Sequence, residues 1–266
     1  MQSAIELLAC PRCHHPLHPG ADPQILQCDR GHTAPIEDGV LILSREDAPS
    51  DPWSRTTAAY AAYKQKVDAP KQDDRDVIAA LTARAGIHHP SVILDICTGR
   101  GALLFDLMQH VDALFISVDK SPTIQTHNCR YQRERFPHRR AFFIAADATA
   151  LPLRTGGIEL ATAFGMGNML NRMRDGLREA VRVLQTDGHL LLNQMHVRED
   201  SVGWQTLAQY FAEQGIDRYR YLGLEPDFRA LLATLKTRAV NATLIRKVIG
   251  DPDRDVEAGP LFPYPN

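Results

Sequence analysis

The chain has 266 residues, of which 44% are hydrophobic and 23% are charged, and its net charge is −2 at neutral pH. This composition is ordinary for a globular protein and excludes collagen-like, coiled-coil and disordered chains. The small net charge provides no global positive field that would recruit nucleic acid or an anionic membrane.

The cysteines and the apolar runs indicate the cellular compartment of the protein. Five cysteines, an odd number, with three in the first 28 residues, do not suggest a disulfide framework. The longest apolar runs have the length of strands, so we expect no membrane span. Residues 1–13 meet two cysteines and a proline too soon for the apolar stretch of a signal peptide. We therefore expect a cytoplasmic protein with one large domain or two unequal ones.

The first motif is a set of paired metal ligands near the N-terminus. Cys10 and Cys13 form one pair, and Cys28 and His32 form a second pair after fourteen intervening residues. Two tight turns of this kind direct three thiolates and one imidazole to one point, which suits tetrahedral zinc. Four protein ligands leave no open position, so the predicted zinc is structural. His32 is preferred as the fourth ligand because it repeats the paired turn, and its competitors are His14, His15 and His18.

Short strands around these turns predict a zinc ribbon over residues 1–45, whose folding energy would come largely from the metal. Residues 5–43 resemble the zinc ribbons of small methyltransferase-activating proteins and the ribbon fused ahead of rRNA guanine-N1 methyltransferases. Residues 1–50 hold three arginines and seven acidic residues, a net charge of 3 − 7 = −4. This charge disfavours contact with phosphates and favours protein docking or an intramolecular role for the ribbon.

A domain boundary is expected after the ribbon, because residues 44–52 are polar and contain two prolines. Two helices are expected next, over residues 53–67 and 73–86. Tyr60 and Tyr63 share a face of the first helix, where they either close over a bound cation or pack the helix against a sheet.

From residue 91 onward, apolar strands alternate with amphipathic helices, which predicts a parallel, doubly wound α/β sheet. We place this second domain at residues 53–249 and an irregular tail at residues 250–266. The expected strands cover residues 92–96, 114–118, 141–145, 159–164 and 189–194, and a hairpin-like edge follows at residues 218–222 and 239–248.

The loop after the first of these strands contains small residues. It runs from Asp95 through Cys97, Thr98 and Gly99 to Gly101. Small residues between a strand and a helix let backbone N–H groups approach a ligand closely. A glycine loop of this kind fits any nucleotide binder, and a dehydrogenase is the alternative. The loop lacks the Gly-x-Gly-x-x-Gly pattern that a dehydrogenase would show.

Acidic residues close to the ends of two further strands narrow the choice of ligand. Asp119 ends the second strand, where a carboxylate can accept both ribose hydroxyls. Asp147, followed by Ala148, comes after the third strand and could accept a hydrogen bond from an adenine amino group. Asp95 could orient the loop or meet an ammonium group. Without a Walker lysine, these acids favour an adenosine that carries a cation over a triphosphate.

This arrangement resembles the class I S-adenosylmethionine-dependent methyltransferases over residues 53–249, and is most similar to the ubiquinone/menaquinone C-methyltransferases. The resemblance implies a Rossmann-like sheet of seven strands and S-adenosylmethionine as the cofactor. The motifs that carry it are residues 94–99, 147–152, 164–168, 177–192 and 219–222.

The resemblance also assigns roles to individual residues. Asp119 would hold the ribose, with Lys120 beside it, and Asp147 and Ala148 would hold the adenine. The methionine end would lie on the loop, and the pocket floor would be formed by Phe164. The loop residues included in this expected cofactor site are Asp95, Cys97, Thr98, Gly99 and Gly101.

The chain also departs from this pattern. Cys97 stands where the first motif glycine is usual, and Arg100 stands where a small residue is usual. Residues 187–189 replace a Pro-Gly-Gly turn, the C-terminal glycine-rich ending is missing, and the quinone-type enzymes lack a zinc ribbon. Cofactor binding is expected to survive these changes, because cysteine is small and the loop glycines remain.

Three functions are compatible with these features. The leading one is methyl transfer to a small aromatic or quinone-like acceptor, in which His196 is either the general base or a surface histidine. The second is an rRNA or tRNA base methyltransferase, in which the ribbon positions RNA and the stretch Lys120–Arg140, of net charge 6 − 1 = +5, contacts phosphates. The third is a non-catalytic protein that binds cofactor and docks a partner through the ribbon.

Overall fold

The computed structural model divides the chain into two compact units, of which one joins Met1–Arg45 to Ala69–Lys236. The other unit, Glu46–Asp68 with Thr237–Asn266, lies outside the described residues, as do the helix expected over residues 53–67 with its two tyrosines and nearly all of the helix expected over residues 73–86. The structure describes residues 4–44, 86–87, 89–164, 173–193, 196–197, 209, 212–213, 223–224 and 230–235. Among these residues, no helix has the length and apolar character needed to cross a bilayer.

Five parallel strands form the centre of the sheet, in the order β7-β6-β5-β8-β9. The prediction of a parallel, doubly wound α/β sheet is confirmed. Their apolar residues are buried on both faces because helices cover both sides, as parallel sheets require. The strand bounds are Val92–Ile96 for β5, Leu114–Asp119 for β6, Arg140–Ala145 for β7, Ile158–Phe164 for β8 and Leu184–Asn193 for β9.

Strand β9 begins five residues earlier than the sequence pattern suggests. It pairs with β8 at Leu184, is interrupted by an irregularity, and resumes at His189. Gly188 lies in this irregularity, where an added Cβ would come within 2.9 Å of the carbonyl oxygen of Ile158. Only glycine therefore allows the two strands to approach so closely at this point.

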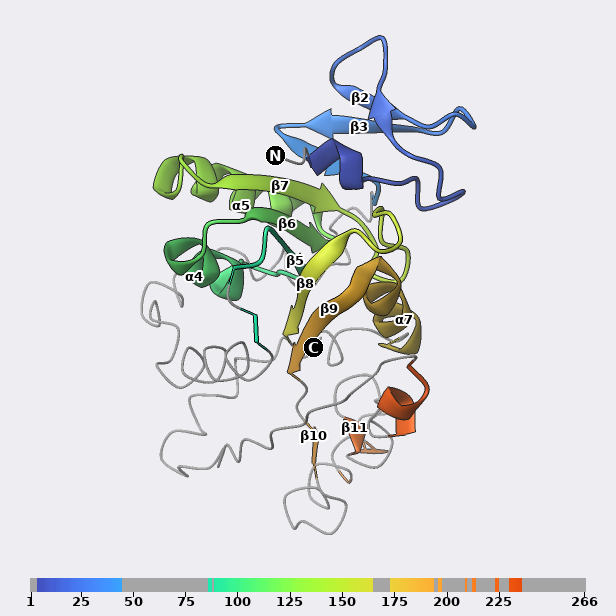
Figure 1. Ribbon diagram of the computed structural model, residues 1–266, viewed down its shortest axis with the longest axis vertical. Coiled ribbons are helices and arrows are strands. Elements are labelled where there is room, and N and C mark those ends of the chain that lie inside the picture. Colours follow the sequence, from blue (N-terminus) through green and yellow to red (C-terminus); the bar gives the residue numbers. More distant parts are fainter. Residues whose placement is uncertain are drawn as a thin grey trace. The chain divides into compact units, whose positions relative to one another are not determined.

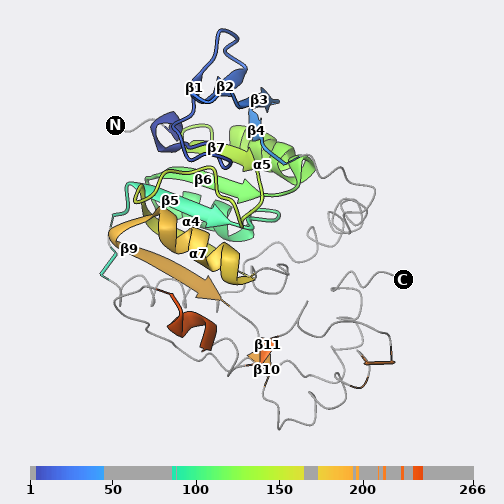
Figure 2. The same cartoon turned by 90° about the vertical axis from the view of Figure 1, so that its right-hand side faces the viewer.

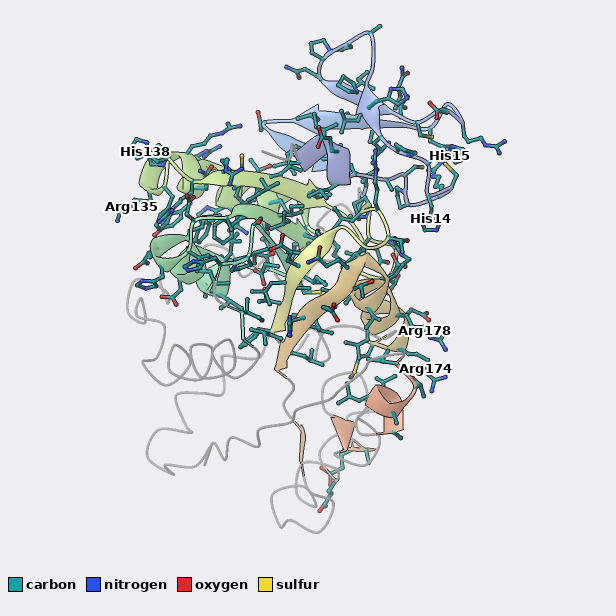
Figure 3. The ribbon with its side chains drawn as sticks, viewed as in Figure 1. His14, His15, Arg135, His138, Arg174 and Arg178 are labelled. Atoms are coloured by element: carbon teal, nitrogen blue, oxygen red, sulfur yellow. The ribbon has the colours of Figure 1, made fainter. Side chains whose placement is uncertain are left out.

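Helices α4 (Ala102–His110) and α5 (Pro122–Arg135) pack on one face of the sheet, and α7 (Met173–Val183) packs on the other. Helix α5 begins with Ser121 as its N-cap, whose hydroxyl accepts the N–H of Ile124 at 3.3 Å. It starts at the carboxyl end of β6 and ends near the start of β7. Its exposed C-terminal side chains, such as Arg135, and the following His138 therefore lie toward the amino ends of these strands (Figure 3).

The N-terminal segment extends this sheet (Figures 1 and 2). Its last strand, β4, runs parallel to β7 and pairs Val40 with Phe143 and Ile42 with Ala145. Strand β4 alternates its side chains between the two faces, so Leu41 joins the core under α7 while Val40 and Ile42 join the core under α4. The segment consists of the 3-10 helix η1 (Ala4–Leu7) and four strands, β1 (His18–Pro19), β2 (Ile25–Gln27), β3 (Thr33–Glu37) and β4 (Val40–Ile42).

Two short strands follow the central sheet. β10 (His196–Val197) pairs in parallel with β11 (Gly223–Leu224), and a short helical turn lies within residues 230–235. Most of the edge expected over residues 218–222 and 239–248 lies outside the described residues, so the last two of the seven expected strands stay a prediction.

Candidate functional site

The candidate cofactor site lies where the strand order reverses. Strands β6 and β7 follow β5 on one side, whereas β8 is placed on the other side of β5. Such a point leaves a crevice outside the carboxyl ends of the two diverging strands, and ligands of open α/β sheets bind there. The loop of residues 97–101 follows β5 and Phe164 ends β8, so the topology places both at this edge of the sheet.

The loop after β5 has an unusual backbone. Cys97, Gly99 and Gly101 all have positive φ angles, of 55°, 53° and 74°. This left-handed conformation is readily adopted by glycine, whereas a cysteine here is uncommon. Gly101 is also the N-cap of α4, and an added Cβ there would lie 2.4 Å from the ring of Phe105. The loop thus turns sharply and leads directly into the N-terminus of a helix, which is a favourable place for a charged or polar ligand group.

Hydrogen bonds hold the loop in this shape. The N–H of Thr98 donates to the carbonyl of Val118 at 3.2 Å, and its hydroxyl donates to the carbonyl of Asp95 at 2.8 Å. From α5, the amide of Asn128 donates to the carbonyl of Gly99 at 2.7 Å. The loop is therefore fixed by β5, β6 and α5 together before any ligand binds.

Asp119 occupies the position expected of the ribose-binding acid, at the end of β6. One carboxylate oxygen accepts the N–H of Gly99 at 2.9 Å, and the other accepts the N–H of Ser121 at 3.0 Å. Each oxygen of an ionised carboxylate can accept a further hydrogen bond. Asp119 is half-buried, so its oriented carboxylate can still take hydroxyl donors from a ligand.

Asp95 is buried at the end of β5, with only 3% of its surface exposed. Thr162 of β8 donates its hydroxyl hydrogen to the carboxylate at 2.6 Å. Burial raises the pKa of Asp95 to about 7, and the nearby charge of Asp119 adds to this increase, while the hydroxyl contacts oppose it. A buried acid in this state can bind a cation in exchange for its proton.

Asp147 follows β7 and is exposed, and Ala148 beside it is buried. The Asp147 carboxylate accepts the N–H and the hydroxyl of Thr149, both at 2.8 Å. Burial raises the pKa of the Cys97 thiol, and the negative charges of Asp119, Asp95 and Asp147 raise it further. The structure thus brings the three predicted acids together around the loop, and it makes Cys97 a neutral thiol at physiological pH.

The remaining residues of the expected site are Lys120, Phe164 and His196. Lys120 is exposed directly after Asp119, and Phe164 is half-buried at the end of β8. His196 lies in β10, and its side chain is outside the part of the structure that is described. Sequence reasoning missed Thr162 and Asn128, which orient Asp95 and the loop, because their partners come from distant parts of the chain.

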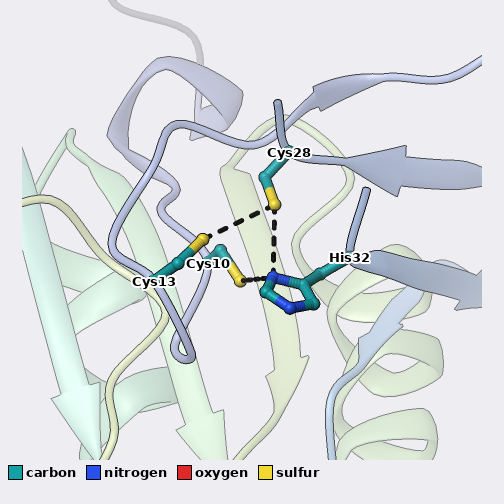
Figure 4. Close-up of side chains that lie close together, drawn as sticks. All are labelled: Cys10, Cys13, Cys28 and His32. Carbon is teal, nitrogen blue, oxygen red and sulfur yellow. Dashed lines mark hydrogen bonds between the residues drawn. The ribbon is translucent and has the colours of Figure 1, made fainter. Parts of the chain in front are cut away.

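The predicted metal ligands also lie together (Figure 4). The ligand atoms of Cys10, Cys13, Cys28 and His32 are all within 4.8 Å of one another. His32 Nδ1 lies 3.4 Å from the sulfur of Cys10 and 3.5 Å from that of Cys28, and the sulfurs of Cys13 and Cys28 are 3.6 Å apart. Around a tetrahedral zinc, ordinary bond lengths give about 3.6 Å between sulfur and nitrogen and about 3.8 Å between sulfurs. The four residues therefore fit zinc.

The competing histidines have other contacts or are exposed. His18 lies 3.0 Å from the carboxylate of Asp29 and His15 lies 3.9 Å from it. His14 is exposed, with a φ of 58°, and is not part of the cluster of possible ligands among the described residues. The donor set has four protein ligands, as a structural zinc site requires.

Comparison with known proteins gives a match over the part of the chain that carries the loop and the three acids. Residues 93–188 match the family described as methyltransferase domain. A demethylmenaquinone methyltransferase of Chlamydia trachomatis is 32% identical over 99 residues, which is 37% of this chain and 42% of that protein. The chain thus spans less than half the length of the curated relatives that it matches.

Solved structures show the same fold. The YcgJ protein of Bacillus subtilis aligns with a TM-score of 0.50 at 19% identity, over 60% of this chain and 67% of its own. A Galdieria sulphuraria protein assigned as a sarcosine dimethylglycine methyltransferase aligns with a TM-score of 0.50 at 13% identity, over 61% of this chain and 60% of its own.

Proposed function

We propose that this chain, whose residues 93–188 form a methyltransferase domain of the Rossmann-like class, transfers a methyl group from S-adenosylmethionine. The observation that carries the proposal is the convergence of Asp95, Asp119 and Asp147 around the left-handed loop at the carboxyl ends of β5, β6 and β7. Oriented carboxylates beside the N-terminus of a helix suit a ligand that combines an adenosine with cationic groups.

Each side chain has a role in this proposal. Asp119 accepts the two ribose hydroxyls, because backbone N–H groups already fix the direction of its carboxylate. Asp147 accepts from the adenine amino group, while buried Ala148 lines the space for the ring. Gly99 and Gly101 let the backbone approach the methionine end, and Asp95 compensates its positive charge.

When bound, S-adenosylmethionine would supply a methyl group on a positively charged sulfur. The acceptor would form a bond to the methyl carbon while the carbon–sulfur bond breaks and the sulfur leaves with the electron pair. Such a reaction depends on positioning more than on a strong base. The loop fixed by Thr98 and Asn128 supplies this positioning on the cofactor side. Where the acceptor must lose a proton, we assign the role of base to His196.

A small aromatic or quinone-like molecule is the acceptor that we favour. The sequence match to a demethylmenaquinone methyltransferase supports this class, although it covers only part of each chain. RNA is less well supported, because Arg135 and His138 lie toward the amino ends of the strands, whereas the loop and the acids lie at the carboxyl ends (Figure 3). Phosphates bound at this end of α5 would therefore lie at the opposite end of the strands from the cofactor.

We also propose that Cys10, Cys13, Cys28 and His32 bind one structural zinc ion. Three of their mutual distances, 3.4, 3.5 and 3.6 Å, fit a tetrahedral site, and a full set of four ligands would give the metal no open position for catalysis. The zinc would therefore stabilise the N-terminal segment and take no part in the chemistry.

The test is an incubation of the protein with methyl-labelled S-adenosylmethionine and a cell extract, followed by fractionation of the label. We expect the label in the organic-soluble fraction, and we expect the Asp119→Ala variant to lose most of it. Label in RNA would contradict a small acceptor. Cofactor binding without transfer to any fraction would instead support a non-catalytic partner protein.

A further inference from the structure

The N-terminal segment holds the adenine-side part of the candidate site at both ends. At one end, the carbonyl of Ala145 accepts the N–H groups of Leu43 and Ser44, both at 2.8 Å. This contact comes two residues before Asp147. The segment from Ala145 to Arg154, which contains Asp147 and Ala148, therefore begins on a strand that is paired with β4.

The other end of this segment is held by residues that immediately precede the metal site. The carbonyl of Pro152 accepts the N–H of Ala9 at 3.0 Å, and the N–H of Arg154 donates to the carbonyl of Leu7 at 2.8 Å. Between these two bonds, Leu8 forms a β-bridge with Leu153. Both leucine side chains are fully buried, so the contact has an apolar core as well as hydrogen bonds.

The predicted zinc ligand Cys10 directly follows Ala9. The turn after it is closed by hydrogen bonds from the N–H of Cys10 to His15 and from the N–H of His14 to Cys10, both at 2.8 Å. A metal bound by Cys10 and by the distant Cys28 would therefore fix residues 7–9 in place. Without a metal, these residues depend on an N-terminal segment that has little core of its own.

We propose that the metal-binding segment is a positioning element for the cofactor site: its two hydrogen-bonded contacts clamp residues 145–154 and thereby hold Asp147 and Ala148 in the geometry that binds adenine. The inference rests on the proposed function, because it assigns these two residues to the cofactor. It makes metal and cofactor binding mutually favourable, and linkage requires each to raise the affinity for the other by the same factor.

The test makes two measurements on the wild type and on each variant. Calorimetry gives the affinity for S-adenosylhomocysteine, and NMR gives the protection of individual backbone amides from hydrogen exchange. Cys28→Ser removes a metal ligand that is remote in sequence from the clamp, and His14→Asn is its control, because asparagine tolerates the positive φ of this exposed residue. Arg154→Pro removes the N–H that binds Leu7 and leaves the metal ligands intact. Arg154→Ala, its control, keeps that N–H.

We expect Cys28→Ser and Arg154→Pro to weaken binding of S-adenosylhomocysteine about tenfold, within the usual range of couplings between sites. The Ala9 amide should lose protection in both variants, while that of Leu94 in β5 stays protected. The two control variants should match the wild type. Zinc affinity of the wild type should rise by the same factor when S-adenosylhomocysteine is present.

Two results would separate the possible errors. If the zinc-loaded wild type does not bind S-adenosylhomocysteine, the proposed function is wrong. If the wild type binds it and Arg154→Pro, folded and zinc-loaded, binds it equally well, the clamp is wrong while the function stands. The Arg154 pair decides the question even if Cys28→Ser does not fold.

Discussion

Thr162 donates its hydroxyl hydrogen to the carboxylate of Asp95 at 2.6 Å, and this contact joins the ends of β8 and β5 at the point where the strand order reverses. The acid is buried, and its pKa is raised to about 7 by that burial, with a further contribution from the charge of Asp119. Asp95 therefore changes its charge in the neutral range, although an exposed aspartate would be ionised throughout it.

The first prediction concerns the pH dependence of stability. Between pH 3.8 and about 7 the unfolded chain has lost the Asp95 proton while the folded protein keeps it. Because the folded state binds more protons, this group lowers the free energy of unfolding as the pH rises through that window, and adds no further change above it. The free energy of unfolding of the wild type and of Asp95→Asn is measured in urea at pH 5 and pH 7. Between these pH values the variant should become more stable relative to the wild type. A constant difference would contradict the assignment.

The second prediction concerns Asp119. Replacement by alanine removes two charge-assisted hydrogen bonds to ribose, so the affinity for S-adenosylhomocysteine should fall by about 2–3 kcal/mol, or roughly 30- to 150-fold. Asp119→Asn is the matched variant, because its amide oxygen can still accept the N–H of Gly99. We expect an intermediate loss for it by calorimetry. Unchanged affinity in Asp119→Ala would show that ribose binds elsewhere.

Much of the central sheet could be predicted because its strands are apolar runs separated by helices of regular pattern. The same regularity places Asp119 and Asp147 at one edge, since parallel strands end together. The clustering of Cys10, Cys13, Cys28 and His32 was predictable from local spacing alone. Thr162 could not be assigned, because its partner Asp95 is 67 residues away and no local motif marks the contact.

The attachment of the N-terminal segment to β7 was also not predicted. Strand β4 has the sequence Val40-Leu41-Ile42, and all three residues are buried. A continuous apolar run of this kind is typical of a strand covered on both faces, whereas a free ribbon would leave one face to solvent. That signal was present, but the polar residues 44–52 after it indicated a boundary between separate domains.

The third prediction compares two glycines of the loop. An alanine at Gly101 would bring its Cβ within 2.4 Å of the Phe105 ring, whereas at Gly99 the nearest atom is 4.0 Å away. Both positions have positive φ angles, so each substitution costs about 1 kcal/mol of backbone strain. Gly101→Ala should cost about 1–3 kcal/mol more, because the ring must move. Equal losses in urea unfolding would contradict the crowding argument.

The fourth prediction concerns metal content. Protein purified without added zinc should contain one equivalent of zinc by elemental analysis, because the four possible ligand atoms already lie within 4.8 Å of one another. Removal of the metal by a chelator should lower the thermal unfolding temperature, since metal binding and folding of this segment are coupled. A content well below one equivalent would refute the zinc assignment.

The last prediction concerns an ion pair that fixes the segment after Asp147 from the other side. Arg182 binds both oxygens of Glu179, at 2.6 and 2.7 Å, and donates to the carbonyls of Leu153 and Leu151 at 2.8 and 3.0 Å. Glu179 in turn accepts the N–H of Leu151 at 2.8 Å. Helix α7 thus holds the backbone of this loop through two side chains that are only 15% and 21% exposed.

Replacing Arg182 by methionine should destabilise the protein by about 3 kcal/mol, because it leaves a largely buried carboxylate and two carbonyls without their donor. Glu179→Gln keeps an acceptor for Leu151 and should cost less. Arg182→Met alone leaves the Glu179 carboxylate without its ion-pair partner, and the double variant has no such carboxylate. The stability lost in the double variant should therefore be smaller than the sum of the two single losses by about 1–2 kcal/mol. A double-mutant cycle in urea measures this difference, and strictly additive losses would mean that the two side chains stabilise the loop independently.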